Sequence, residues 1–224
     1  VSYCDFKNVA RVLSTMSYAG IDNAQNWYKA STYYSGIVMR FDLFKMTYNT
    51  FSSIYSGISW GTPPATNLDI SYNTIRDCYT IFTCFNLFIT NSVNPVAHTT
   101  IVTQNVSNNN FINIRILDGH NWTMSLIRTS GMATVNNNQF INVTQQPCYL
   151  SGGNSKFSNN TIVMGNSTQP FSTCIILSKT GSFTNTIENN IVTAPLCSFL
   201  AIEGTNSAII QRNKLSCCTK YRAI

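Results

Sequence analysis

One six-residue pattern recurs along the chain: an apolar residue, two variable residues, Asn, one variable residue and a second apolar residue. Chance would produce about two or three such matches in a chain of this composition. Repeats with roughly regular but elastic spacing are typical of a solenoid, because its corner loops can vary in length without disturbing the stack. The seven clear matches are MTYNTF (46–51), ISYNTI (70–75), VSNNNF (106–111), VNNNQF (135–140), FSNNTI (157–162), IENNIV (187–192) and IQRNKL (210–215).

The intervals between repeats leave two places open. FITNSV (88–93) also fits, so Asn91 either marks a coil of its own or lies in a loop inside one 36-residue coil from Asn73 to Asn109. VSYCDF at residues 1–6 fits with Cys4 in the Asn position, and the 45 residues from Cys4 to Asn49 are enough for two coils.

The recurring Asn has a physical explanation at the corner of a coil. A sharp corner needs a residue in the left-handed backbone conformation, which Gly, Asn and Asp tolerate best. The Asn carboxamide both donates and accepts hydrogen bonds, so stacked Asn side chains can form a continuous ladder. We therefore expect a corner ladder of Asn49, Asn73, Asn109, Asn138, Asn160, Asn190 and Asn213. The apolar residues after it should stack inside as Phe51, Ile75, Phe111, Phe140, Ile162, Val192 and Leu215.

A third apolar strand follows the repeat in several coils, at 148–150, 174–177 and 197–200. The sequence thus predicts an all-β, right-handed parallel β-helix with about three short strands per coil. We expect residues 1–224 to form a single domain, as a segment of a longer solenoid or a stacking unit. The 28 Asn, 26 Thr and 24 Ser supply the polarity that such a surface needs, since only 10% of residues are charged.

This repeat resembles that of the pectate-lyase-like superfamily of parallel β-helix proteins, in which Asn ladders occur at one corner. The resemblance covers about residues 46–215 and is specific for the fold. It is weak for function, because that superfamily includes polysaccharide lyases and hydrolases, phage tailspikes, surface adhesins and structural proteins.

Catalytic members of the superfamily group several acids on one face of the coil, because one carboxyl must donate a proton while another acts as base or nucleophile. This chain has six Asp and two Glu, with neither an Asp-Asp pair nor an Asp-x-Asp sequence. The nearest approach, Asp118-Gly119-His120-Asn121 near Arg115, is interpreted as a polar corner turn, and His98 as a loop residue. We therefore predict a non-catalytic member without catalytic, cofactor-binding or metal residues.

Partners are constrained by charge and hydropathy. The net charge of +6 comes from 14 dispersed Lys and Arg, which do not form the basic face that a nucleic-acid partner requires. The longest apolar stretch, 81–89, is too short and too interrupted to span a membrane.

The cysteine pattern favours a secreted or surface protein. The eight cysteines lack the paired spacing of a zinc site and are candidates for disulfides, although buried thiols in a cytosolic protein fit as well. They are Cys4, Cys78, Cys84, Cys148, Cys174, Cys197, Cys217 and Cys218. Cys148, Cys174 and Cys197 occupy similar places in their coils and should stack inward, as thiols or as one bridge. Candidate N-glycosylation sites are Asn105, Asn121, Asn142, Asn159 and Asn166, about as many as composition alone would give.

Two functions remain. The first is a structural or adhesive module of an extracellular fibre, appendage, coat or virion surface. Neither end shows a cap, so we expect the stack to continue into further chain or onto another copy, making a homo-oligomer or filament. The alternative is a carbohydrate-binding or polysaccharide-degrading β-helix, in which exposed aromatic residues stack on sugar rings: Trp27, Trp60, Trp122, Tyr33 and Tyr34.

Overall fold

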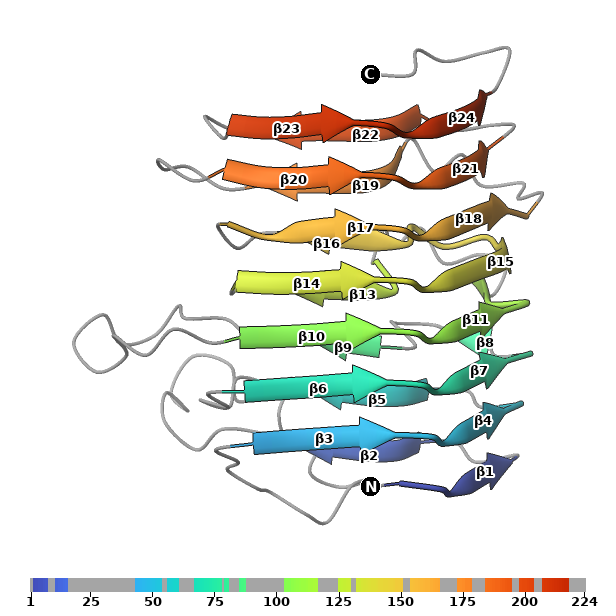
Figure 1. The fold of residues 1–224 in the computed structure, drawn as a ribbon. Coiled ribbons are helices and arrows are strands. Elements are labelled where there is room, and N and C mark those ends of the chain that lie inside the picture. Colours follow the sequence, from blue (N-terminus) through green and yellow to red (C-terminus); the bar gives the residue numbers. More distant parts are fainter. Residues whose placement is uncertain are drawn as a thin grey trace, which may run out of the picture.

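The chain winds into a right-handed parallel β-helix, seen in a computed structural model as a column of stacked coils (Figure 1). Every strand pair in the described part is parallel, so each strand lies beside its equivalent in the next coil. The structure describes residues 2–7, 11–15, 43–53, 56–60, 67–77, 79–80, 85–87, 103–116, 125–129, 132–150, 154–165, 173–178, 184–194, 198–203 and 207–217.

Two long sheets meet at the ladder corner (Figure 1). The seven-stranded sheet precedes the corner and contains β3 (Leu43–Thr47), β6 (Asn67–Ser71), β10 (Thr103–Ser107), β14 (Met132–Asn136), β17 (Lys156–Ser158), β20 (Thr184–Glu188) and β23 (Ser207–Gln211). The eight-stranded sheet follows it and contains β1 (Asp5–Lys7), β4 (Thr50–Ser52), β7 (Thr74–Arg76), β11 (Asn110–Ile112), β15 (Gln139–Val143), β18 (Thr161–Met164), β21 (Ile191–Ala194) and β24 (Lys214–Cys217).

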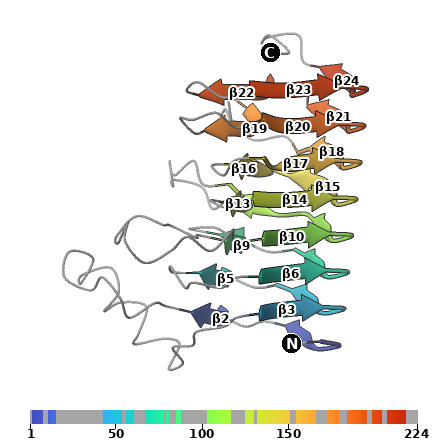
Figure 2. The same cartoon turned by 60° about the vertical axis from the view of Figure 1, so that its left-hand side comes forward.

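A third face closes the coil, which confirms the expectation of three strands per coil (Figure 2). It carries one sheet of three strands, β2 (Arg11–Thr15), β5 (Ser56–Trp60) and β9 (Phe85–Leu87), and one of four, β13 (Ile127–Thr129), β16 (Cys148–Leu150), β19 (Thr173–Ser178) and β22 (Ser198–Glu203). Two coils add a fourth short strand that the sequence did not predict, β8 (Tyr79–Thr80) beside β12 (Arg115–Ile116).

Side chains from the two long sheets fill the interior. Because strand residues alternate between faces, one column of each sheet points inward. Phe51, Phe111 and Phe140 are 0–1% exposed, and the rings of Phe111 and Phe140 stack at 4.9 Å between centroids. Burial of each such side chain contributes about 1.5–3 kcal/mol. The predicted column is confirmed as far as Val192, whereas Leu215 in the last described coil is only partly buried.

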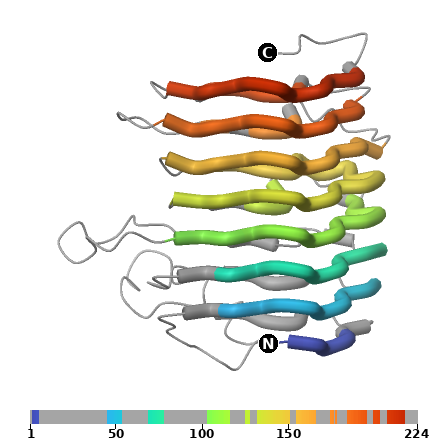
Figure 3. Tube along the Cα trace, in the orientation of Figure 1, coloured from blue at the N-terminus to red at the C-terminus, as the bar shows by residue number. Residues whose placement is uncertain are grey.

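The register settles both open intervals. Strand β6 pairs directly with β10, so Asn91 marks no coil and the 36-residue alternative is correct. Strand β1 pairs directly with β4, with Asp5 opposite Thr50, so the 45 residues after Cys4 form one coil and the two-coil expectation was wrong. In the tube, the described strands on either side of each long interval lie in neighbouring coils, with residues 103–107 directly beside residues 67–71 (Figure 3).

Candidate functional site at the ladder corner

The seven predicted Asn residues form one continuous ladder between the two long sheets. After Asn49, the Oδ1 of each accepts hydrogen bonds from the backbone N–H and the Nδ2 of the Asn in the preceding coil, as Asn109 does from Asn73. The six Nδ2–Oδ1 distances are 2.8–3.2 Å. The second Nδ2 hydrogen goes to a backbone carbonyl, for example from Asn138 to Val106 at 2.9 Å. Cys4 occupies the first position, where its N–H bonds Asn49 Oδ1 at 3.0 Å.

The left-handed residue is the one before the ladder Asn, which corrects the sequence expectation. These preceding residues have φ of 54–58°, and no ladder Asn has a positive φ. The division has a steric reason: the residue that makes the bend projects outward, whereas the next residue projects into the corner and reaches the neighbouring coils. The outward column, called the outer column below, is Tyr3, Tyr48, Tyr72, Asn108, Asn137, Asn159, Asn189 and Arg212.

Three stacked tyrosines form the first part of the outer column. The rings of Tyr3 and Tyr48 lie 5.1 Å apart at 4°, and those of Tyr48 and Tyr72 lie 4.8 Å apart at 3°. A left-handed residue other than Gly, Asn or Asp costs about 1–2 kcal/mol, and stacking of about 0.5–1.5 kcal/mol per pair offsets this. The sequence reasoning missed this row, although Tyr directly precedes the ladder position in VSYCDF, MTYNTF and ISYNTI.

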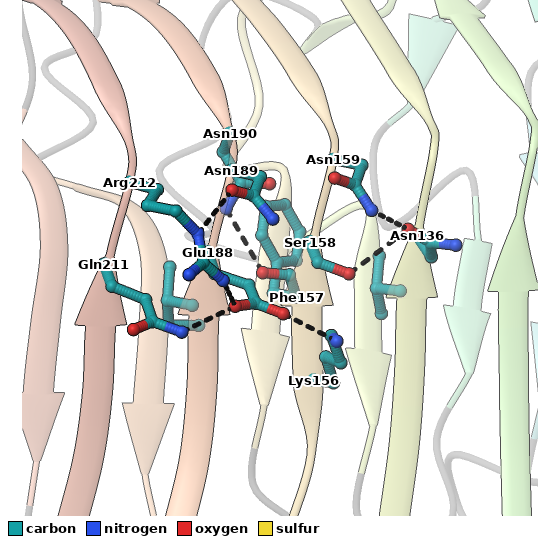
Figure 4. A network of polar contacts seen from close by, with 12 residues as sticks. Asn136, Lys156, Phe157, Ser158, Asn159, Glu188, Asn189, Asn190, Gln211 and Arg212 are labelled. Carbon is teal, nitrogen blue, oxygen red and sulfur yellow. Dashed lines mark hydrogen bonds and ion pairs between the residues drawn. The ribbon is translucent and has the colours of Figure 1, made fainter.

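Beside the other end of the ladder, Glu188 joins three coils (Figure 4). Its carboxylate accepts hydrogen bonds from Lys156 Nζ at 2.6 Å and from Gln211 Nε2 at 2.7 Å. It also forms an ion pair with Arg212 Nη2. The Lys156 hydrogen bond, followed by that of Gln211, lowers the pKa of Glu188 from 4.5 to about 2 against the opposing effect of burial. Glu188 is therefore ionised and surrounded by hydrogen-bond donors. We interpret it as a residue that links three coils, and not as a proton donor. Sequence reasoning did not predict this cluster.

A second, shorter amide row runs along the far end of the eight-stranded sheet. Asn142 Nδ2 donates to Asn113 Oδ1, and Asn113 Nδ2 donates to Asp77 Oδ1, both at 2.8 Å. All three residues are left-handed, with φ of 53–55°. The row stops at Gly165, where an added Cβ would lie 2.5 Å from Asn142 Oδ1. Asp77 is the one charged member of this three-residue row.

One buried amide in the interior lacks a hydrogen-bond partner. Gln104 on β10 is 2% exposed, and among the residues that the structure describes neither its Oε1 nor its Nε2 has a hydrogen-bond partner. It stands in register between Leu68 and Ala133. An unsatisfied buried polar group costs about 1–3 kcal/mol, so Gln104 weakens this coil.

The structure contains no disulfide at Cys4, Cys148 or Cys174. Cys148 and Cys174 are both buried, but the prediction that they stack on one another was wrong, because Cys148 lies opposite Ile175. Burial raises the pKa of the Cys148 thiol. Cys4 is exposed and free, so disulfides are not found at these three positions. Cys217 lies in β24, and Cys78, Cys84, Cys197 and Cys218 lie outside the described residues.

Three of the five sequons fall on described residues. Asn159, in the outer column, is exposed, and its Nδ2 donates to Asn136 Oδ1. Asn105 and Asn142 are partly buried, and their Nδ2 atoms donate to Asp69 and Asn113. Asn121 and Asn166 lie outside the described residues.

The aromatic residues proposed for sugar stacking are not placed by the structure. Trp27, Trp122, Tyr33 and Tyr34 lie outside the described residues, and Trp60 lies in β5 without a described side chain. His98 and Asp118-Gly119-His120-Asn121 also lie outside, while Arg115 lies in β12.

Comparison with protein-family models, curated proteins and solved structures gives no match to this chain. Within the described coils, no three His, Cys, Asp or Glu side chains gather closely enough to hold a metal ion. The same part of the chain contains no helix of the length and apolarity needed to cross a membrane.

Proposed function

We propose that this chain is a non-catalytic structural module, a β-helical shaft of the pectate-lyase-like type that extends by end-to-end stacking. One observation carries the proposal. Ile210 belongs to an inward column whose other members, Met46, Ile70, Val106, Val135, Phe157 and Ile187, are 0–1% exposed, yet Ile210 is 36% exposed. The apolar interior is therefore open at the last described coil. An open coil end is covered in a stable solenoid by a cap or by further coils.

The surroundings of Ile210 support the same function. Ile209 and Ile202, from β23 and β22, are 47% and 41% exposed. None of the described strands pairs with β23 or β24 on the side facing away from β20 and β21, and such an edge is a template for another strand. Exposed apolar area beside a free strand edge is a suitable surface for a second stack of the same cross-section.

An extracellular or cell-surface location fits this proposal. Four members of the outer column carry uncharged amide side chains, namely Asn108, Asn137, Asn159 and Asn189. Of the three described sequons, Asn159 is the exposed one and would be the most accessible to a glycan. Its attachment would decorate the outer column without entering the interior.

Electron microscopy of the purified chain, combined with sedimentation velocity over a range of concentrations, tests this function. We expect rods whose length and sedimentation coefficient rise with concentration, at a width equal to one β-helix. Ile210→Glu should reduce assembly by placing a charge on the open interior, whereas Ile191→Glu, a side-face substitution at a 50% exposed position, should leave it unchanged. Separate particles of one chain at every concentration would contradict self-assembly.

A second candidate function is binding of a polysaccharide along the outer column. The observation in its favour is the tyrosine row, with Tyr3 80%, Tyr48 48% and Tyr72 51% exposed. The inner faces of these rings are covered by one another, so a sugar would contact ring edges, hydroxyls and the free face of Tyr3. Isothermal titration with oligosaccharides tests this candidate, and Tyr48→Asn, which copies later members of the column, should abolish any heat of binding.

A further inference from the structure

The three stacked tyrosines of the outer column are arranged for oxidative coupling. A one-electron oxidant removes a hydrogen atom from the hydroxyl of tyrosine, and two of the resulting phenoxyl radicals join through ring carbons next to their hydroxyls. We propose that Tyr48 is the site of a dityrosine cross-link, formed with Tyr3 on one side or with Tyr72 on the other by a haem peroxidase and hydrogen peroxide. This inference does not depend on self-assembly of the chain.

The backbone holds the three rings in one orientation in successive coils. Tyr3, Tyr48 and Tyr72 have φ of 56°, 58° and 58°. The ring centroids lie 5.1 Å apart in the first pair and 4.8 Å apart in the second, and the rings are nearly parallel, at 4° and 3°. The adjacent ladder keeps this spacing, since Asn49 Nδ2 donates to Asn73 Oδ1 at 3.0 Å. A radical on one ring therefore has its partner already in place, and coupling within the chain has a large advantage over coupling between chains.

Exposure makes these side chains accessible to the oxidant. Tyr3, Tyr48 and Tyr72 are all exposed, so the peroxidase product can reach them and water can take up the phenolic protons. Tyr149 on β16 differs in both respects. It is only partly exposed, and it lies between Arg128 and Ile176 in register, so the strands on either side of it offer no tyrosine at that position.

The coupling balances with hydrogen peroxide as the oxidant. Each of two tyrosines gives up its hydroxyl hydrogen atom, which is one electron and one proton, and the peroxide is reduced to two molecules of water. The two radicals form a carbon–carbon bond between the positions ortho to their hydroxyls. The proton on each of those carbons then moves to the oxygen of the same ring, which restores both phenols. The rings must tilt away from parallel while the bond forms, and their outward position leaves room for this tilt.

A link between Tyr3 and Tyr48 would close the longest coil interval of the described stack. These residues are 45 positions apart in the sequence, whereas ladder residues from Asn49 onward follow one another at intervals of 22–36 residues. A cross-link removes more entropy from the unfolded chain as the loop that it closes becomes longer. The link would therefore hold the coil that loses the most chain entropy on folding.

Oxidation of the folded chain by a haem peroxidase and hydrogen peroxide tests the site. Exposed thiols are alkylated first, so that they do not consume the oxidant. Trypsin then releases Tyr3 within residues 1–7 and the other two tyrosines within residues 46–76. Tandem mass spectrometry should find two products, each lighter by two hydrogen atoms than its unlinked form. One is residues 1–7 joined to 46–76 through Tyr48, and the other is residues 46–76 closed into a loop between Tyr48 and Tyr72.

Phenylalanine variants separate coupling from stacking. Tyr48→Phe keeps a ring in the row but removes the hydroxyl, so both linked products should disappear. Tyr3→Phe should remove only the product that contains residues 1–7. Tyr149→Phe is the matched control and should leave both products unchanged. In concentrated urea the yield from the unchanged chain should fall severalfold, because the unfolded chain no longer holds the rings side by side.

Linked products that require both Tyr48 and the folded state support the site. The linked chain should also have a Tm about 5–15 °C higher, as for a disulfide that closes a loop of this length. The inference is overturned if residues 46–76 remain unlinked after peroxidase treatment, or if both products persist in Tyr48→Phe. A yield that rises in proportion to protein concentration would assign the coupling to contacts between chains and would overturn it as well.

Discussion

Removal of one interior rung of the ladder should destabilise the protein far more than removal of an exposed neighbour. Asn138→Ala removes an Oδ1 that accepts from Asn109 N and Nδ2, both at 3.0 Å, and an Nδ2 that donates to Val106 O and Asn160 Oδ1. Asn138 is 1% exposed, so water does not replace these bonds easily. Two donors of Asn109 and the carbonyl of Val106 lose their partners. At about 1–3 kcal/mol for each buried unsatisfied group, with partial relaxation, the free energy of unfolding should fall by about 3–5 kcal/mol.

Urea unfolding followed by circular dichroism measures this change, and hydrogen exchange of the Asn109 amide reports it locally. Gln139→Ala is the matched control, since Gln139 follows Asn138 directly, is exposed and lies outside the ladder. Asn213→Ala should cost about 1 kcal/mol, because water reaches its partly exposed partners. Equal stability of the Asn138→Ala and Gln139→Ala variants would refute the claim that the ladder holds the coils together.

Four further predictions concern single sites. The stability contributed by Glu188 should be fully present above pH 4.5 and lost as the pH falls toward 2, because its pKa is lowered in the folded state. Acid titration followed by circular dichroism should show this loss, and the Glu188→Gln variant should lack this pH dependence. Gly165→Ala should lower the free energy of unfolding by about 1–3 kcal/mol, because the added Cβ clashes with Asn142 Oδ1. Chemical denaturation measures this loss, which should be smaller in an Asn142→Ala background. Gln104→Met should raise stability by about 1–3 kcal/mol in the same assay by removing an unsatisfied amide. Cys4 should react with a thiol reagent in the folded protein, while Cys148 and Cys174 react only on unfolding, because both are buried.

The fold was predictable because the ladder position accepts almost no substitute. Only a short side chain with both a donor and an acceptor can bond two coils at once, so Asn recurs at Asn73, Asn138 and Asn190 while the residues around it vary. The inward column was predictable for a related reason, since any large apolar side chain serves there. Phe111, Ile162 and Val192 differ in shape and yet all are fully buried.

Other features depend on contacts between residues far apart in the chain. Tyr72 and Arg212 share the left-handed position, and the sequence pattern alone did not separate that position from the ladder Asn. The Glu188 cluster joins residues 32 positions and 23 positions away, at Lys156 and Gln211, and these become neighbours only after the coil lengths are known. The single long coil between Cys4 and Asn49 was missed because solenoid spacing places no upper limit on a corner loop.

The ladder also gives the stack a direction, and this direction limits how copies can join. Every backbone N–H and one Nδ2 hydrogen of a ladder Asn point toward the following coil, and every Oδ1 accepts from the preceding coil. One end of the stack therefore presents donors at this corner, as Asn213 does, and a matching partner must present an acceptor. Two copies joined through their Asn213 ends would bring donors against donors. Head-to-tail extension, as we propose for this chain, is the arrangement in which the ladder hydrogen bonds and the parallel strands agree.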